Sequence, residues 1–128
     1  MERNKYVIVM AGTIFTPYLL AAFKQVLHGL IGRSCPLFPI LQMTIEKFAI
    51  ACPDIRIITV LPKEYVQEWK NICAKYNFIY PQILVEGGIT RFHSVRNALA
   101  KVPDGALVAI QDGVRPLVTP ELIHRMFE

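Results

Sequence analysis

The sequence has few charged residues, few cysteines and no signature of a disulfide framework or a metal site. Its three cysteines, Cys35, Cys52 and Cys73, are odd in number, include no Cys-x-x-Cys pair and have no histidine at metal-ligand spacing. We therefore expect reduced thiols in a cytoplasmic protein. Charged residues are 19% and apolar residues 53% of the chain, which excludes disorder and favours a sheet buried on both faces. The 128-residue length supports one core, so we expect a single domain over residues 1–128.

Positive charge is in modest excess and is not concentrated anywhere. The formal net charge of +4 comes from lysines and arginines spread along the whole chain. The dense basic cluster that would indicate a nucleic-acid or lipid surface is missing. We expect no nucleic-acid partner, and the excess charge favours small anionic ligands such as phosphates.

Residues 6–23 form a long run without charge that follows the basic start MERNK. Its length makes a membrane span or a signal peptide an alternative. However, Gly12 and Pro17 interrupt the run, its 18 residues fall short of the ~20 that a spanning helix uses, and no small-residue cleavage site follows. We expect no membrane association, and partitioning into detergent would distinguish the anchored alternative.

Short apolar runs alternate with helical patterns along the chain. The runs are bounded by turn residues and predict four strands, at residues 5–10, 55–61, 82–85 and 106–111. Strands that alternate with helices imply right-handed βαβ crossovers. The expected fold class is therefore α/β, with a doubly wound, mainly parallel sheet.

Helices are predicted at residues 64–76 and 94–102, where apolar residues recur every three or four positions. A last helix is predicted to begin after Thr119, with Thr119 as N-cap and Pro120 in the first helical position. Ser94 is expected to be the N-cap of its helix, with the residues of one helical face buried: Val95, Ala98, Leu99 and Val102. Residues 13–42 fit least well and regain a helical pattern only at 43–50.

Polar residues follow the last predicted strand. Asp112 and Arg115 come directly after an apolar run, where ligands of open α/β sheets bind. A carboxylate there can hold a divalent cation that bridges phosphates, and a guanidinium can bind phosphate through paired hydrogen bonds. The alternative is that Asp112 caps a turn and pairs with Arg115 on the surface.

Two glycines follow the third predicted strand. Gly87 and Gly88 would let the backbone approach a base or ribose closely, with Arg91 and Ser94 as polar contacts. The first strand ends similarly, at Ala11-Gly12. In a parallel sheet all three strand ends would line one edge.

Two of these stretches resemble a known family. EGGITRFHSVRNAL, followed by a strand and QDGVRPLV, is similar to the paired signature of the cytidylyltransferases that make 4-diphosphocytidyl-2-C-methylerythritol, in which GGxxRxxSVxxGL precedes a strand ending in HDxxRP. The match runs from about Ile55 to Glu128. Gln111 stands where the family usually has His. Of the interactions that a histidine can make there, the glutamine keeps only hydrogen bonding.

The resemblance implies a Rossmann-like nucleotidyltransferase fold, CTP as donor, Mg²⁺ as cofactor and a homodimer. By motif position, Gly88 and Ser94 resemble the cytidine contacts, and Arg91 belongs to the same stretch. Asp112 resembles the metal or substrate contact, and Arg115 the residue near the sugar phosphate.

The first strand should be followed by the family's glycine-rich loop, A-[AG]-G-x-G-x-R-[ML], and a P-K-Q triplet, where this chain has AGTIFTPYLLAAFKQ. Four positions agree with the pattern: Ala11, Gly12, Lys24 and Gln25. Four depart from it and remove two loop glycines, the catalytic arginine and the proline of the triplet: Thr13, Phe15, Pro17 and Phe23. Ala11 and Gly12 thus remain nucleotide-binding candidates, and Lys24 remains a catalytic candidate for the phosphates.

The implied activity is cytidylyl transfer from CTP to 2-C-methyl-D-erythritol 4-phosphate, by a chain that would be the N-terminal part of a longer family domain. A polyol phosphate such as ribitol 5-phosphate is an alternative acceptor. A nucleotide-binding remnant without activity is an alternative of another class, because the loop between Thr13 and Phe23 has lost its chemistry.

Overall fold

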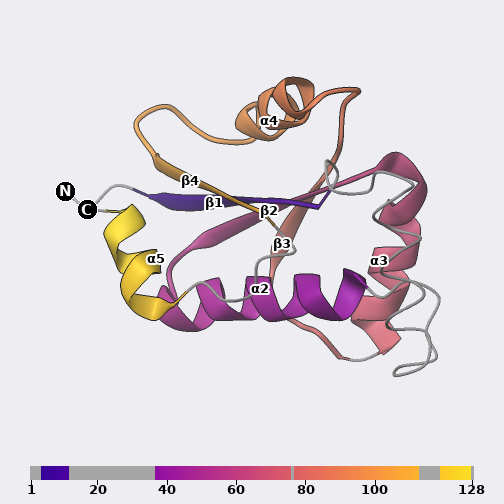
Figure 1. Cartoon of the computed structure of the whole chain (residues 1–128), viewed down its shortest axis with the longest axis horizontal. Coiled ribbons are helices and arrows are strands. Elements are labelled where there is room, and N and C mark those ends of the chain that lie inside the picture. The colour runs from indigo at the N-terminus through magenta and orange to yellow at the C-terminus, as the bar shows by residue number, and fades with distance from the viewer. Residues whose placement is uncertain (1–3, 12–36, 76, 113–118, 128) are drawn as a thin grey trace.

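The chain forms a four-stranded parallel sheet with helices on both faces (Figure 1). The computed structural model describes residues 4–11, 37–75, 77–112 and 119–127. The strands, in chain order, are β1 (Lys5–Met10), β2 (Arg56–Leu61), β3 (Gln82–Glu86) and β4 (Leu107–Asp112). The helices are α2 (Leu37–Ala51), α3 (Lys63–Lys75), α4 (Arg91–Leu99) and α5 (Pro120–Met126).

All four predicted strands are confirmed to within one residue at each end. The strand order is β3-β2-β1-β4, and every neighbouring pair is parallel. Register places Ile8 of β1 between Ile58 of β2 and Ile110 of β4. The chain runs outward from β1 to β3 and then returns to the other side of β1, so the strand order reverses between β1 and β4.

Each face of the sheet has its own apolar cluster, because side chains alternate along a strand. Val7 and Val9 of β1 face α2, α3 and α5, and the intervening Ile8 faces α4. Figure 1 shows α4 alone on one side of the sheet and α2 and α5 on the other. The expected doubly wound arrangement is therefore present, with β1 fully buried at its centre from Val7 to Met10.

Helix α4 begins earlier than expected, and its cap is a different residue. Thr90 is the N-cap, and its hydroxyl accepts a hydrogen bond from the backbone N–H of His93. Ser94 lies inside the helix and is buried, so its prediction as N-cap is wrong. The predicted apolar face is right at Ala98, which is fully buried, and wrong at Leu99, which is 45% exposed.

The other helices follow the sequence pattern more closely. Trp69 of α3 is fully buried, as the predicted periodicity requires, whereas Tyr76 lies outside the described residues. Thr119 caps α5 by accepting from the N–H of Leu122, with Pro120 in the first turn, as predicted. Helix α2 extends well beyond the predicted 43–50, back to Leu37.

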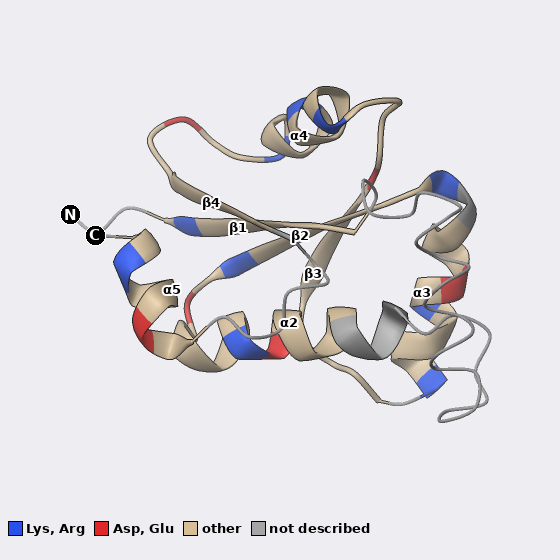
Figure 2. Ribbon diagram, viewed as in Figure 1, with Lys and Arg blue, Asp and Glu red and all other residues tan. Residues whose placement is uncertain are grey.

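Charged side chains lie on the helices, at the ends of strands and in turns. Figure 2 shows lysine and arginine on α2, α3, α4 and α5, without a concentrated basic face in the coloured part of the chain. Residues 6–10 of the uncharged run lie in β1, an inner strand of the sheet. In the part of the chain that the structure describes, no helix has the length and apolar character needed to cross a membrane.

Candidate active site

The carboxyl ends of the strands open onto one edge of the sheet, as the parallel order requires. Ala11 follows β1 and is held there by its N–H, which donates to the carbonyl oxygen of Val60 at 2.9 Å. Asp112 ends β4 and pairs in register with Met10. Ala11 and Asp112 therefore border the point where strand order reverses, which is where ligands bind in open α/β sheets.

The Gly87-Gly88 loop continues β3 and is held at both glycines. The N–H of Gly87 donates to the carbonyl of Leu61 at 2.7 Å, which extends the pairing of β3 with β2 beyond the end of the strand. The N–H of Gly88 donates to Ser94 Oγ at 3.0 Å. Gly88 and Ser94, both predicted as cytidine contacts, thus touch each other directly.

Gly88 is also required by close packing against the first turn of α4. A Cβ at this position would lie 2.4 Å from the Cβ of His93, a distance that no relaxed side chain tolerates. At Gly87 the nearest atom would be Ser94 Oγ at 3.3 Å, a tight but nearly ordinary contact. Only the second glycine is therefore sterically obligatory.

Ser94 and Arg91 differ in what they offer a ligand. Ser94 is only 1% exposed, and its hydroxyl oxygen already accepts a hydrogen bond from the N–H of Gly88. The hydroxyl therefore serves to hold the Gly87-Gly88 loop in place. Arg91 is the first residue of α4 and is exposed. Its guanidinium adds positive charge at a helix N-terminus, where phosphate groups are favoured.

The structure describes only part of the remaining predicted site residues. Gly12, Lys24 and Arg115 lie outside the described residues, as does the side chain of Asp112. Gly88 follows β3 and Asp112 ends β4, with β2 and β1 between them. At the usual strand spacing the two strand ends are about 14 Å apart, so Gly88 and Asp112 share an edge but meet only through a ligand that spans it.

One contact at this edge was missed by the sequence reasoning. Asn97, one helical turn after Ser94, donates from Nδ2 to the carbonyl oxygen of Glu86 at 3.2 Å. The available signal was a polar residue three positions after Ser94, because such pairs share a helical face. Asn97 lies between the predicted apolar positions Val95 and Ala98, so the periodicity of the helix does not single it out.

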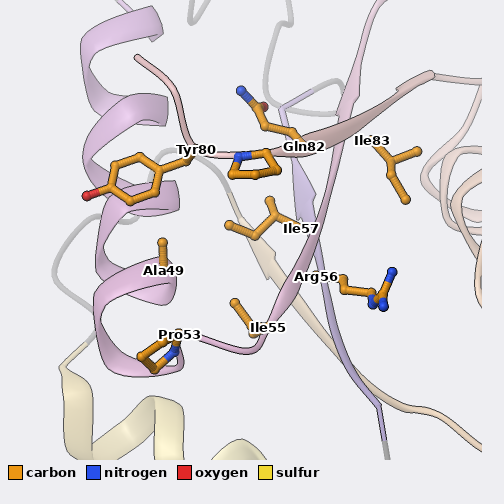
Figure 3. A pocket seen from close by; sticks show the side chains of 9 residues that line it. Ala49, Pro53, Ile55, Arg56, Ile57, Tyr80, Gln82 and Ile83 are labelled. Carbon is orange, nitrogen blue, oxygen red and sulfur yellow. The ribbon is translucent and has the colours of Figure 1, made fainter. Parts of the chain in front are cut away.

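The structure also contains a hollow at the opposite, amino edge of the sheet (Figure 3). It has a volume of about 470 Å³ and lies between the end of α2 and the starts of β2 and β3. Figure 3 shows Ile57 and Ile55 turned toward α2, and Arg56 turned to the other face of the sheet. The wall facing α2 is therefore apolar, and among the lining residues the charged side chain of Arg56 points away from it.

The structure defines an α/β protein with a doubly wound parallel sheet, and the comparisons place it in a family. The sequence profile of the 2-C-methyl-D-erythritol 4-phosphate cytidylyltransferase family, IspD, matches residues 34–128. The chain is 43% identical over 126 residues to the enzyme of that name from Azobacteroides pseudotrichonymphae, with 98% of this chain covered. It is 39% identical to the one from Porphyromonas gingivalis W83 over the whole chain. The chain therefore belongs to this family.

The match reaches further upstream than the expected start near Ile55, since it includes residues 34–54. The chain spans about half the length of these curated relatives, 54% in both cases. Among solved structures, 4-diphosphocytidyl-2C-methyl-D-erythritol synthase from Anaerococcus prevotii has a TM-score of 0.68 at 22% identity, over 96% of this chain and 48% of that one. This likeness supports the fold.

Proposed function

We propose that the chain takes part in cytidylyl transfer from CTP to 2-C-methyl-D-erythritol 4-phosphate, a step of non-mevalonate isoprenoid biosynthesis. A phosphate oxygen of the acceptor attacks the α-phosphorus of CTP. The new P–O bond forms as the α–β anhydride bond breaks, and pyrophosphate leaves. The observation that carries the proposal is the Gly88–Ser94 contact, which fixes the family's glycine motif at the same sheet edge as Asp112.

The residues at this edge have distinct proposed roles. The Gly87-Gly88 loop and Ala11 bring backbone close to the nucleoside, and Arg91 adds charge beside it. Lys24 and Arg115 neutralise phosphate groups as charge develops at the reacting phosphorus. In reactions of this type positioning and charge neutralisation supply most of the rate, so no acid–base pair is required here.

A divalent cation is part of the proposal, with Mg²⁺ as the expected ion. Among the described residues no three His, Cys, Asp or Glu side chains gather into a metal site. This fits Mg²⁺, which usually binds to one or two carboxylates together with substrate phosphates and water. Asp112 would supply the carboxylate, and the ion would offset phosphate charge. A related fold, Rv0371c from Mycobacterium tuberculosis, has been solved as a manganese complex.

The loop after β1 sets the expected rate of this chain. Phe15 stands where a glycine would let backbone N–H groups surround the triphosphate, and Pro17 stands where a guanidinium would stabilise the transition state. Loss of that guanidinium alone costs about 3–4 kcal/mol of transition-state stabilisation, a hundredfold or more in rate. We therefore propose low turnover, and the second candidate function is nucleotide binding without catalysis.

The test is pyrophosphate release from CTP, Mg²⁺ and the acceptor. We expect little release from the chain as it stands and a gain in the combined variant Thr13→Gly/Phe15→Gly/Pro17→Arg, with each single change doing less. Ribitol 5-phosphate in place of the methylerythritol phosphate tests the alternative acceptor. Turnover near ~10 s⁻¹ by the unsubstituted chain, an ordinary enzyme rate, would show that other residues carry the chemistry.

The partners and compartment complete the proposal. We propose a homodimer, as the family resemblance implies, that works in the cytoplasm without nucleic-acid or membrane partners. Sedimentation at several concentrations, with and without CTP, tests the dimer. A single monomeric species throughout would contradict it.

A further inference from the structure

Three hydrogen bonds fix the backbone from Glu86 to Gly88, and two of them come from α4. The Gly87 N–H is bound to Leu61, and the Gly88 N–H is bound to Ser94 Oγ. The carbonyl of Glu86 accepts from Asn97 Nδ2. Ser94 and Asn97 stand three residues apart, so one face of one helix holds the loop at two successive points.

The clamp changes what the loop can offer a ligand. Both glycine N–H groups are already used, so neither remains as a donor. No described residue donates a backbone hydrogen bond to the carbonyl of Gly87 or Gly88. In the clamped state the backbone groups that the loop still offers are carbonyl oxygens, and this acceptor state complements a base edge that carries an amino group.

We infer that Asn97 is a positioning residue that holds the Gly87-Gly88 loop in this acceptor state and thereby favours a 4-amino over a 4-oxo pyrimidine nucleotide. The inference rests on the proposed function for the identity of the ligand. Cytosine presents N–H donors at C4, whereas uracil presents a carbonyl oxygen that would face the loop carbonyls. A loop freed from Asn97 could turn an N–H outward, which would accept uracil as well.

The geometry separates Asn97 from Ser94 in how it can be tested. Ser94 is buried, and removing it leaves the Gly88 N–H without its partner. Asn97 is only partly buried, so its substitution should leave the fold intact. Asn97→Asp keeps the shape of the side chain and removes the Nδ2 donor that binds the carbonyl oxygen of Glu86. Asn71 is the matched control, because it is an exposed helical asparagine of α3 that accepts a 3.0 Å hydrogen bond from Gln67, away from the loop.

The first measurement is amide hydrogen exchange at Gly87 and Gly88 in the free chain. We expect exchange about fivefold faster in Asn97→Asp and unchanged in Asn71→Ala, because loss of one hydrogen bond makes local opening easier by about that factor. Asn97→Gln, which retains an amide donor, should restore part of the protection. Equal exchange in Asn97→Asp and the unsubstituted chain would overturn the clamp.

The second measurement is the ratio of CTP to UTP affinity, from NMR titrations with Mg²⁺. We expect a preference for CTP that falls at least about threefold in Asn97→Asp and stays unchanged in Asn71→Ala. If Asn97 had a merely structural role, Asn97→Asp would weaken the binding of CTP and of UTP equally, and that result would overturn the inference. If the unsubstituted chain bound neither nucleotide, the proposed function and the selectivity would both fall, and the exchange data would still decide the clamp.

Discussion

The backbone N–H of Gly88 donates a hydrogen bond of 3.0 Å to the buried hydroxyl of Ser94, six residues later. This contact closes the turn between β3 and α4. Since Gly88 also lies against His93, the turn has no room for a side chain. The family's glycine and serine are therefore structural partners in this chain, whether or not a ligand is bound.

The two glycines of the turn should respond differently to alanine. Gly88→Ala places a Cβ 2.4 Å from that of His93, and we expect it to lower the free energy of unfolding by about 1–3 kcal/mol. In Gly87→Ala the closest contact of the new Cβ is Ser94 Oγ at 3.3 Å, so this change should cost clearly less. Urea unfolding of both variants measures the difference, and equal losses would contradict this packing.

Gln82 joins two elements of the core and should be hard to replace. Its Oε1 accepts from Thr59 Oγ1 at 2.7 Å and from Trp69 Nε1 at 3.1 Å. Gln82→Leu removes the acceptor of both hydrogen bonds, so we expect a loss of about 2–4 kcal/mol in unfolding free energy.

Gln67→Leu is the control for this change. Gln67 donates to Asn71 on the exposed surface of α3, and a change within about 0.5 kcal/mol is expected there. If chemical denaturation gave similar losses for the two leucine variants, the Gln82 network would not contribute to the core.

Two thiols should remain unreactive at neutral pH. Burial raises the pKa of the Cys52 thiol above its ordinary value of 9.0, with Lys5 opposing the shift and Asp54 adding to it. Burial likewise raises the pKa of Cys73, partly offset by a hydrogen bond from Gln82. In a Cys35→Ser background we expect slow modification by a disulfide reagent at pH 7, since the thiolate is the reactive form.

The same shifts give a pH dependence with a definite sign. A thiol whose pKa is higher in the folded chain stabilises it fully below the unfolded pKa of about 9 and loses that contribution as pH rises through the folded value. Stability should therefore decline more steeply above pH 9 than in a Cys52→Ala/Cys73→Ala variant. Parallel curves for the two proteins would show that the thiols have ordinary pKa values.

Nucleotide binding should be confined to the carboxyl edge. CTP with Mg²⁺ should shift the amide NMR signals of residues 86–94 and 111–115 more than those of α3, because α3 covers a face of the sheet and the proposed site lies at the carboxyl edge. The comparison needs no substitution. Equal shifts throughout, or none at millimolar CTP, would argue against this site.

Local patterns in the sequence predicted much of the architecture. Short apolar runs separated by helical periodicity identified every described strand and the parallel α/β class, because a strand buried on both faces requires such runs. Thr119-Pro120 likewise announced the start of α5, since capping depends on adjacent residues. The glycine pair and Asp112 were placed at strand ends for the same reason.

Only the tertiary structure decided which distant groups meet. Whether Thr90 or Ser94 caps α4 depends on where the turn after β3 closes. Thr90 is the cap, because the hydroxyl of Ser94 is buried and accepts a hydrogen bond from the N–H of Gly88. The separation of Gly88 from Asp112 by two strands follows from the order β3-β2-β1-β4, which long-range packing selects. Asn97 gains its role in the same way, because its partner is a carbonyl eleven residues away that no helical pattern records.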